Sequence, residues 1–228
     1  MTSRTALIVG ATGLVGSHCL ELLRSETHYR RVVVLTRRTL GVADGKLGEE
    51  LVDFDRLDEH PDTFRCDDVY CCLGTTRKVA GSNEAFRKVD HDYVVDVARL
   101  AKAGGARRFA LVSSVGADVR SRNFYLRVKG ETERDVEALG FQVLQIFRPS
   151  FLVGERHVRR PGEAVAGVVS RGVAGALVGP LRKYRPIEAS TVAAAMVRSL
   201  VQPGQGEPGH HVHTFDGIQS LVPRDASV

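Results

Sequence analysis

Three glycines follow the first apolar run of the chain at intervals of three residues, and this turn restricts the fold more than any other part of the sequence. Residues 6–9 form a short strand-like run, and Gly10, Gly13 and Gly16 come after it. From there apolar residues recur at helical spacing to Arg24. A turn this sharp needs a residue without Cβ, an anion held against the backbone needs a second, and a helix packed closely on its strand needs a third. The pattern therefore predicts a strand, an anion-binding turn and a helix.

Short apolar runs alternate with longer helical stretches along most of the chain. The predicted strands are residues 6–9, 32–35, 51–54, 69–73, 109–112, 143–147 and 211–215, and the predicted helices are residues 14–24, 84–103, 125–139 and 191–201. Neighbouring parallel strands need a crossover, and each crossover helix covers a face of the sheet. We therefore predict an α/β protein with a Rossmann-like, doubly wound parallel sheet and helices on both faces.

No Pro/Ser-rich linker and no internal repeat divides the chain, so we expect a single domain over residues 1–220 with a frayed tail at 221–228. Glycine and proline interrupt the pattern over residues 154–188. This segment predicts a small, irregular substrate or lid lobe near the C-terminus.

The formal net charge of +5 does not indicate a nucleic-acid partner, because basic and acidic residues are interleaved along most of the chain. One interval differs. Over residues 156–185 the basic residues are opposed only by Glu163. That density predicts a small, anionic substrate, with a solvated basic loop as the alternative.

Composition also bears on compartment and assembly. No run reaches the roughly 18 uncharged apolar residues of a membrane span, and no cleavage site follows the N-terminus, so we expect a cytoplasmic protein without membrane contact. The four cysteines match neither a disulfide framework nor a zinc site, and we expect no metal. Both a monomer and a homodimer remain open.

The glycine turn stands at the first strand–helix junction, which predicts a dinucleotide with its pyrophosphate at the amino end of the helix. About twenty residues further on, an NAD site usually carries an acidic side chain for the ribose 2′-hydroxyl. This chain has Arg37 and Arg38 there instead. Two guanidinium groups suit a 2′-phosphate. We therefore predict a preference for NADP(H) over NAD(H), with a pair of solvated arginines as the alternative.

Tyr125 and Lys129 are four residues apart on a predicted helix and so share one face. Ser113 and Ser114 end the preceding strand, at the edge where doubly wound sheets bind ligands. A nearby ammonium favours the ionised form of a phenol, which allows the phenol to act in acid–base catalysis near neutral pH. A serine hydroxyl can donate a hydrogen bond to a substrate oxygen. The alternative is a packed tyrosine beside a solvated lysine.

These features resemble a known family. The motifs that carry the resemblance are residues 71–77 (CCLGTTR), 113–118 (SSVGAD), 125–131 (YLRVKGE), 147–149 (FRP) and 160–162 (RPG). Together with the glycine turn they resemble the atypical branch of the short-chain dehydrogenase/reductase superfamily, and within it the Tat-interacting-protein oxidoreductases, over about residues 6 to 200.

The resemblance implies a set of coenzyme-binding positions. They are Gly10, Thr12, Gly13, Leu14, Val15, Gly16, Arg37, Arg38, Leu73, Gly74, Tyr125, Lys129, Leu152 and Arg160, with Asp53 near the adenine amino group. By the same resemblance Tyr125 is the proton donor, and Lys129 is its modulator and a ribose ligand. The chain departs from the superfamily in one place: the asparagine that often precedes the catalytic strand has no equivalent among residues 90–93.

The resulting hypothesis is an NADPH-dependent oxidoreductase that reduces a small carbonyl compound, with Ser114 or Ser113 orienting the carbonyl oxygen. Two alternatives stay open. One is a non-catalytic NADPH-binding redox sensor whose lobe orders on the nucleotide and meets a protein partner. The other is epimerase- or dehydratase-like chemistry on a nucleotide sugar.

Overall fold

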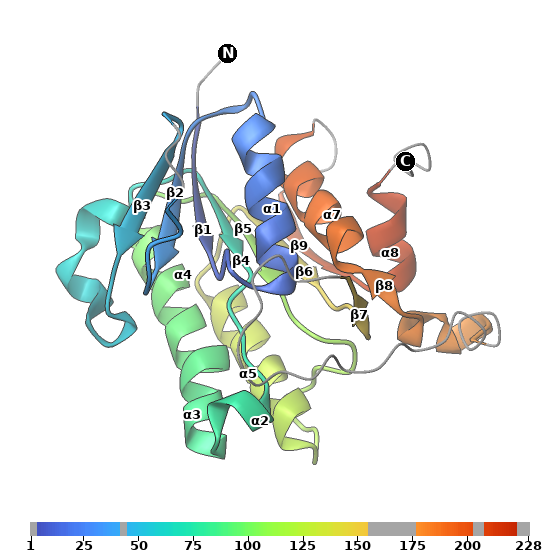
Figure 1. Cartoon of the computed structure of the whole chain (residues 1–228). Helices are drawn as coiled ribbons and strands as arrows, with labels where there is room; N and C mark the ends of the chain where they lie inside the picture. Colours follow the sequence, from blue (N-terminus) through green and yellow to red (C-terminus); the bar gives the residue numbers. More distant parts are fainter. Residues whose placement is uncertain (1–3, 42–44, 155–176, 203–207, 223–228) are drawn as a thin grey trace.

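The computed structural model describes residues 4–41, 45–154, 177–202 and 208–222 of the chain. Seven parallel strands form the main sheet in the order β3-β2-β1-β4-β5-β6-β9 (Figure 1). They are β1 (Arg4–Val9), β2 (Tyr29–Thr36), β3 (Leu47–Leu51), β4 (Asp68–Cys71), β5 (Arg108–Val112), β6 (Val143–Phe147) and β9 (Gly209–His213). A second, two-stranded sheet pairs β7 (Leu152–Val153) with β8 (Ile187–Glu188).

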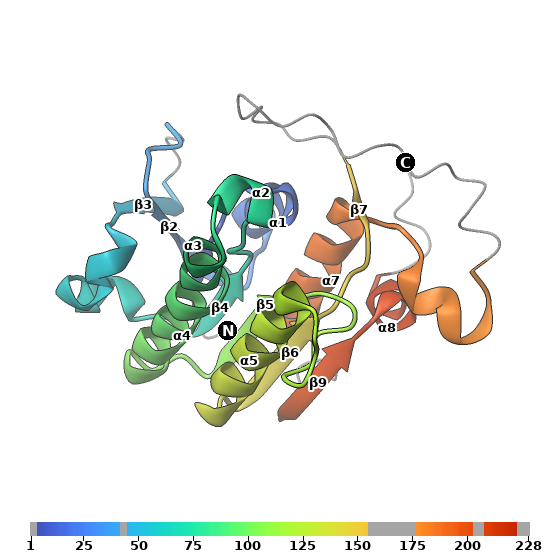
Figure 2. The same ribbon diagram turned by 90° about the horizontal axis from the view of Figure 1, so that it is seen from below.

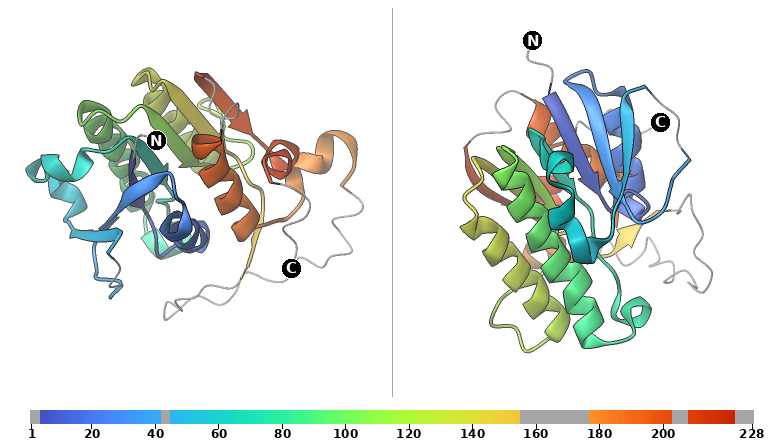
Figure 3. Two further views of the ribbon diagram at one scale, coloured as in Figure 1. Left: turned by 90° about the horizontal axis from the view of Figure 1, so that it is seen from above. Right: turned by 90° about the vertical axis from the view of Figure 1, so that its left-hand side faces the viewer.

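Helices cover both faces of the main sheet (Figures 1 and 3). One face carries α1 (Leu14–Ser25) and α7 (Ala189–Val201), which pack on each other. The other carries α4 (Tyr93–Ala103) and α5 (Phe124–Ala138), which lie side by side in Figure 2. Each face has its own apolar core, because the side chains of a parallel strand alternate between the two faces. The Rossmann-like fold predicted from the sequence is confirmed.

Short elements complete the described chain. They are η1 (Phe54–Glu59), η2 (Pro61–Phe64), α2 (Arg77–Ala80), α3 (Asn83–Arg87), the π-helical turn η3 (Lys88–Asp92), η4 (Gly179–Tyr184) and α8 (Phe215–Ser220). Within the described ranges, no helix is both long and apolar enough to span a bilayer.

Three sequence predictions need correction. The strand predicted at residues 211–215 is β9, which ends at His213, and Phe215 begins α8. The strand predicted at residues 51–54 lies earlier, as β3, whereas Phe54 begins a 3₁₀ turn. β3 is an edge strand with half-exposed side chains, so it lacks an apolar run. The buried apolar residues that follow it belong to a turn and not to the strand. The helix predicted at 84–103 is interrupted by η3 between α3 and α4.

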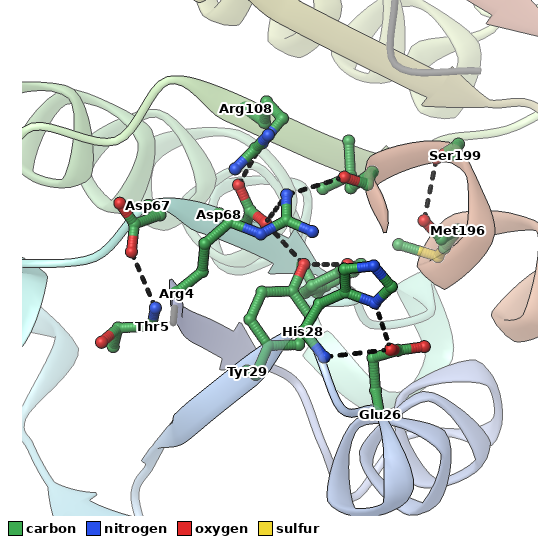
Figure 4. A network of polar contacts seen from close by, with 12 residues as sticks. Arg4, Thr5, Glu26, His28, Tyr29, Asp67, Asp68, Arg108, Met196 and Ser199 are labelled. Atoms are coloured by element: carbon green, nitrogen blue, oxygen red, sulfur yellow. Dashed lines mark hydrogen bonds and ion pairs between the residues drawn. The ribbon is translucent and has the colours of Figure 1, made fainter. Parts of the chain in front are cut away.

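A buried polar network ties the amino ends of four strands together (Figure 4). Asp68, at the start of β4, is fully buried and pairs with Arg108 of β5 and with Arg4 of β1, the latter at 3.2 Å. Tyr29 of β2 donates a hydrogen bond to the same carboxylate at 2.5 Å, and its oxygen lies 2.7 Å from that of Tyr70. This network lies at the opposite end of the sheet from the glycine turn, and its role is structural.

Candidate active site

The carboxyl ends of β1, β4 and β5 meet at one edge of the sheet. β1 lies between β2 and β4, so the strand order reverses there. In open parallel sheets such a reversal leaves a crevice just beyond the strand ends, where ligands bind. The glycine turn after β1, the loop after β4 and the serines after β5 all lie at this edge.

The backbone of the glycine turn leaves no room for side chains at two of its three glycines. Gly10 has a φ of 79°, and a Cβ there would lie 2.5 Å from the carbonyl oxygen of Cys72. A Cβ on Gly16 would lie 2.1 Å from the carbonyl oxygen of Gly10. The turn is closed by a hydrogen bond of 2.9 Å from the Gly13 N–H to the Gly10 carbonyl. Glycine is therefore required by packing as well as by conformation.

The amino end of α1 fits an anion. Gly13 is the N-cap and no side chain caps the helix, so the N–H groups of Leu14 and Val15 in the first turn have no intrahelical acceptor. These groups and the helix dipole favour negative charge. Thr12 is half-buried directly before this end. The residues present thus fit a pyrophosphate.

Arg37 and Arg38 follow β2 at the same edge and are both exposed. Within the described part of the chain, neither guanidinium has an acidic partner. Asp53 is exposed as well, and its carboxylate caps η1 by accepting the Asp55 N–H at 3.0 Å. All three positions are open to a ligand, and their contacts with a coenzyme remain a proposal.

Tyr125 and Lys129 project from the first turns of α5, as the spacing predicts. Asn123 caps this helix, and its side chain accepts the N–H of Tyr125 at 3.0 Å. The tyrosine ring is half-buried and lies 5.5 Å from the ring of Phe86, between centroids. Lys129 is buried, which excludes the alternative of a solvated lysine. Burial by itself would lower the pKa of Lys129, but its charge interactions with Asp90 and Tyr125 raise that pKa above its ordinary value.

Asp90 is the residue of this site that the sequence analysis missed. It lies on the π-helical turn η3 and its Oδ1 is 2.8 Å from the Nζ of Lys129. Its Oδ2 accepts the N–H of Thr75 at 2.7 Å, and its carbonyl accepts the hydroxyl of Thr132 at 2.9 Å. A Cβ on Gly74 would lie 3.2 Å from Oδ1. Asp90 therefore joins the loop after β4 to α5.

The two serines after β5 differ in their environment. Ser113 is buried and its hydroxyl donates a hydrogen bond to Glu133, which also accepts the Nε of Arg148 at 2.9 Å. Ser114 is half-buried, and among the described residues its hydroxyl makes only a long contact, 3.5 Å, to the carbonyl of Val115. Of the two hydroxyls, that of Ser114 is thus the less engaged, and that of Ser113 joins the strand end to α5.

Four further predicted coenzyme positions lie on other parts of the chain. Leu73 and Gly74 begin the loop after β4, beside Asp90. Leu152 opens β7 in the small second sheet. Arg160 lies outside the described residues, as does most of the predicted lobe at 154–188.

A hollow of about 840 Å³ lies at the opposite, amino edge of the sheet. Its lining includes Thr5, Arg30, Arg65 and Lys46, and none of the predicted site residues. We therefore do not place the chemistry there.

Fold and site together define a class. A doubly wound parallel sheet with a glycine turn after β1 and a Tyr–Lys pair on α5 is the architecture of the short-chain dehydrogenase/reductase type. Residues 6–213 match the family described as "NAD dependent epimerase/dehydratase family", and the chain belongs to that family.

Relatives support this assignment. Protein HTATIP2 of Rattus norvegicus is 40% identical over 211 residues, which are 91% of this chain and 85% of the relative. "Protein fmp52, mitochondrial" of Emericella nidulans is 34% identical over 212 residues and 88% of each chain. The resemblance to the Tat-interacting-protein group is confirmed.

Solved structures share the fold. WbmH of Bordetella bronchiseptica, in complex with NAD+, aligns with a TM-score of 0.68 at 17% identity and covers 93% of this chain and 76% of its own. MoeE5, in complex with UDP-glucose and NAD, aligns with a TM-score of 0.65 at 19% identity, with coverages of 91% and 74%.

Proposed function

We propose that the protein is an NADPH-dependent oxidoreductase that reduces a small carbonyl compound. The observation that carries the proposal is the buried ammonium of Lys129 next to Tyr125, at the sheet edge where the glycine turn and Ser114 also lie. A solvent-shielded ammonium beside a phenol is the chemistry of a tuned proton donor.

The chain's own residues have separate roles in this proposal. Bound NADPH supplies the hydride. Ser114 donates a hydrogen bond that orients the carbonyl oxygen, and Tyr125 transfers its phenolic proton to that oxygen as negative charge develops. Lys129 stabilises the phenolate that remains and contacts the ribose. Burial of Lys129 shields these charges from water and strengthens their interaction.

The coenzyme-binding part of the proposal follows from the fit described above. The pyrophosphate binds at the N–H groups of α1, and Arg37 and Arg38 pair with the 2′-phosphate. The coenzyme is also contacted by Leu73, Gly74, Leu152 and Arg160. Asp53 accepts a hydrogen bond from the adenine amino group. NADP(H) is therefore preferred over NAD(H).

NADPH oxidation measured by stopped flow against a panel of aldehydes and ketones tests the reaction. We expect Tyr125→Phe to reduce turnover by at least about a hundredfold, because proton transfer of this kind contributes 10²–10⁴ in rate, while NADPH affinity stays unchanged. Tyr93→Phe, on α4 and hydrogen-bonded to Asp55, is the matched control and should retain activity. Full turnover by Tyr125→Phe would refute the assignment, and affinity without turnover on any substrate would favour the redox sensor.

A nucleotide-sugar reaction is the second candidate. The family description and the UDP-glucose held by MoeE5 favour it. Calorimetry with UDP-glucose in the presence of coenzyme decides between the two. Binding followed by conversion of the sugar, seen by NMR, would replace the carbonyl reductase.

Substrate, assembly and location complete the proposal. We propose a small anionic substrate. Of the basic residues at 156–185 that are described, Arg182 is paired with Asp216 at 2.6 Å. Lys183 and Arg185 are left for such a contact, and Arg185 also donates a hydrogen bond to the Leu177 carbonyl at 2.7 Å. We propose a monomer or homodimer in the cytoplasm, although a fungal relative carries the word mitochondrial in its name. Sedimentation and cell fractionation test these two points.

A further inference from the structure

Asp90 is a buried carboxylate to which the proposed reaction assigns no part. The exposed fractions of the Asp90 and Lys129 side chains are 1% and 7%, and their charged atoms lie 2.8 Å apart. The second oxygen of Asp90 is held by the Thr75 N–H at 2.7 Å. Both oxygens therefore have partners, on α5 and on the loop after β4, and the carboxylate has one fixed orientation.

Several other charged groups near this pair have partners of their own. On η3 and on the helices packed against it, Arg87 pairs with Glu131, Lys88 with Asp55, and His91 with Asp92 and Asp135, whereas Arg127 of α5 donates to the Ser121 carbonyl at 3.0 Å. Burial raises the pKa of the Cys71 thiol on β4 to about 12, so that group is neutral. Among the described residues, Asp90 is thus the only carboxylate within ion-pair distance of Lys129.

The ion pair changes what Lys129 can do to Tyr125. An isolated ammonium near a phenol favours the phenolate, whereas an ammonium paired with a carboxylate acts on the phenol as a much weaker dipole. We propose that Asp90 is a positioning residue that holds Lys129 in a neutral pair and thereby keeps the Tyr125 hydroxyl protonated, and able to donate, at neutral pH. The proposal deepens the reductase function and rests on it.

The charge of the carboxylate makes the proposal specific, because a neutral amide at this position would leave the charge of Lys129 uncompensated. The carboxylate compensates that charge and so favours the protonated phenol. The protonated phenol is the form that donates a proton when a carbonyl is reduced, and the phenolate is the form that accepts the proton of an alcohol in the reverse reaction. Asp90→Asn therefore tests the charge with little change in shape.

Tyrosine absorbance offers a readout that needs no turnover. The chain has five tyrosines and no tryptophan, so tyrosinate absorbance is not masked by indole. Burial raises the pKa of Tyr29, of Tyr70 and of Tyr93, and these three groups ionise late. The difference between the pH titrations of the parent protein and of Tyr125→Phe isolates Tyr125.

We expect Asp90→Asn to move the titration midpoint of Tyr125 downward by about one pH unit, the size typical of a close charge. The same difference titration is made in the Asp90→Asn background. Asp92→Asn, which removes the same charge two residues further along the helix, should leave the midpoint in place, because Asp92 bonds to His91 and not to Lys129. An unchanged or raised midpoint in Asp90→Asn would overturn the proposal.

Stability and kinetics complete the test. If Asp90→Asn does not fold, Asp90→Ser also removes the charge and keeps a hydroxyl for the Thr75 N–H. Failure of both variants to fold would refute the proposal, because the carboxylate would then be chiefly structural.

In active protein the alkaline decline of kcat/KM for reduction should shift to lower pH in Asp90→Asn by the same amount as the midpoint of Tyr125. Absence of turnover in the parent protein would refute the reductase and leave the titration to decide the role of Asp90.

Discussion

Arg37 and Arg38 lie on a turn whose backbone is held by hydrogen bonds. The Thr36 hydroxyl donates a hydrogen bond of 2.8 Å to the Arg38 carbonyl and accepts the Arg38 N–H at 3.3 Å. The backbone after β2 is therefore fixed while both guanidinium groups stay exposed. A fixed backbone, with cations that have no acidic partner among the described residues, lowers the cost of ordering them around a phosphate.

The double variant Arg37→Ala/Arg38→Ala should weaken NADPH binding by at least about tenfold, the loss of one charge-assisted hydrogen bond, and leave NADH binding nearly unchanged. Calorimetric titration of both coenzymes measures the difference. Arg30→Ala, on the same strand at its amino end, is the control. Equal weakening of both coenzymes would show that the arginines do not recognise the 2′-phosphate.

Some residues of the candidate site could be predicted from the sequence alone. Tyr125 and Lys129 could be paired because helical spacing places both on one face, and the serines could be placed because a strand ends there. Asp90 could not be found in this way. Its partner is 39 residues away, and the contact depends on a π-helical turn that apolar periodicity does not reveal.

Elements with a clear apolar pattern lie close to their predicted limits. β6 has the predicted limits, and β5 and α5 differ from prediction by one residue. β3 lies at the sheet edge and has no apolar run, so its position depends on pairing with β2, which a local pattern cannot show. The short α8 was not predicted, since one turn and a half carries too little periodicity.

The network at the amino ends of the strands predicts a stability effect. Asp68→Asn should lower the free energy of unfolding by about 3 to 5 kcal/mol, because Arg4 and Arg108 would lose their buried partner. Urea denaturation measures the change. Asp62→Asn breaks an exposed pair with Arg65 and should leave the free energy of unfolding nearly unchanged. Similar effects of the two variants would contradict a structural role for the network.

Stability of the whole molecule should depend on pH through His213. This residue of the edge strand β9 stacks on Phe147 at 5.1 Å between centroids, and its Nε2 lies 2.5 Å from the Gln145 side-chain oxygen. Burial and then the charge of His211 lower the pKa of His213 from 6.5 to about 4. The unfolded chain therefore binds the proton more readily, so stability is present above pH 6.5 and declines as pH falls toward 4.

Urea denaturation of the parent protein and of His213→Asn across this pH range checks the prediction. The parent should lose more stability than the variant between pH 6.5 and pH 4. Parallel curves for the two proteins would show that His213 does not titrate differently on folding.

The packing of α7 on α1 has a consequence for biosynthesis. α7 begins only at Ala189 of 228 residues, yet its apolar side chains, such as Val192 and Met196, complete the core on the α1 face of the sheet. During translation α1 alone can cover this face until α7 has left the ribosome. The nascent chain thus presents the apolar surface meant for α7 over the synthesis of most of the sheet, which makes it a natural client for chaperones.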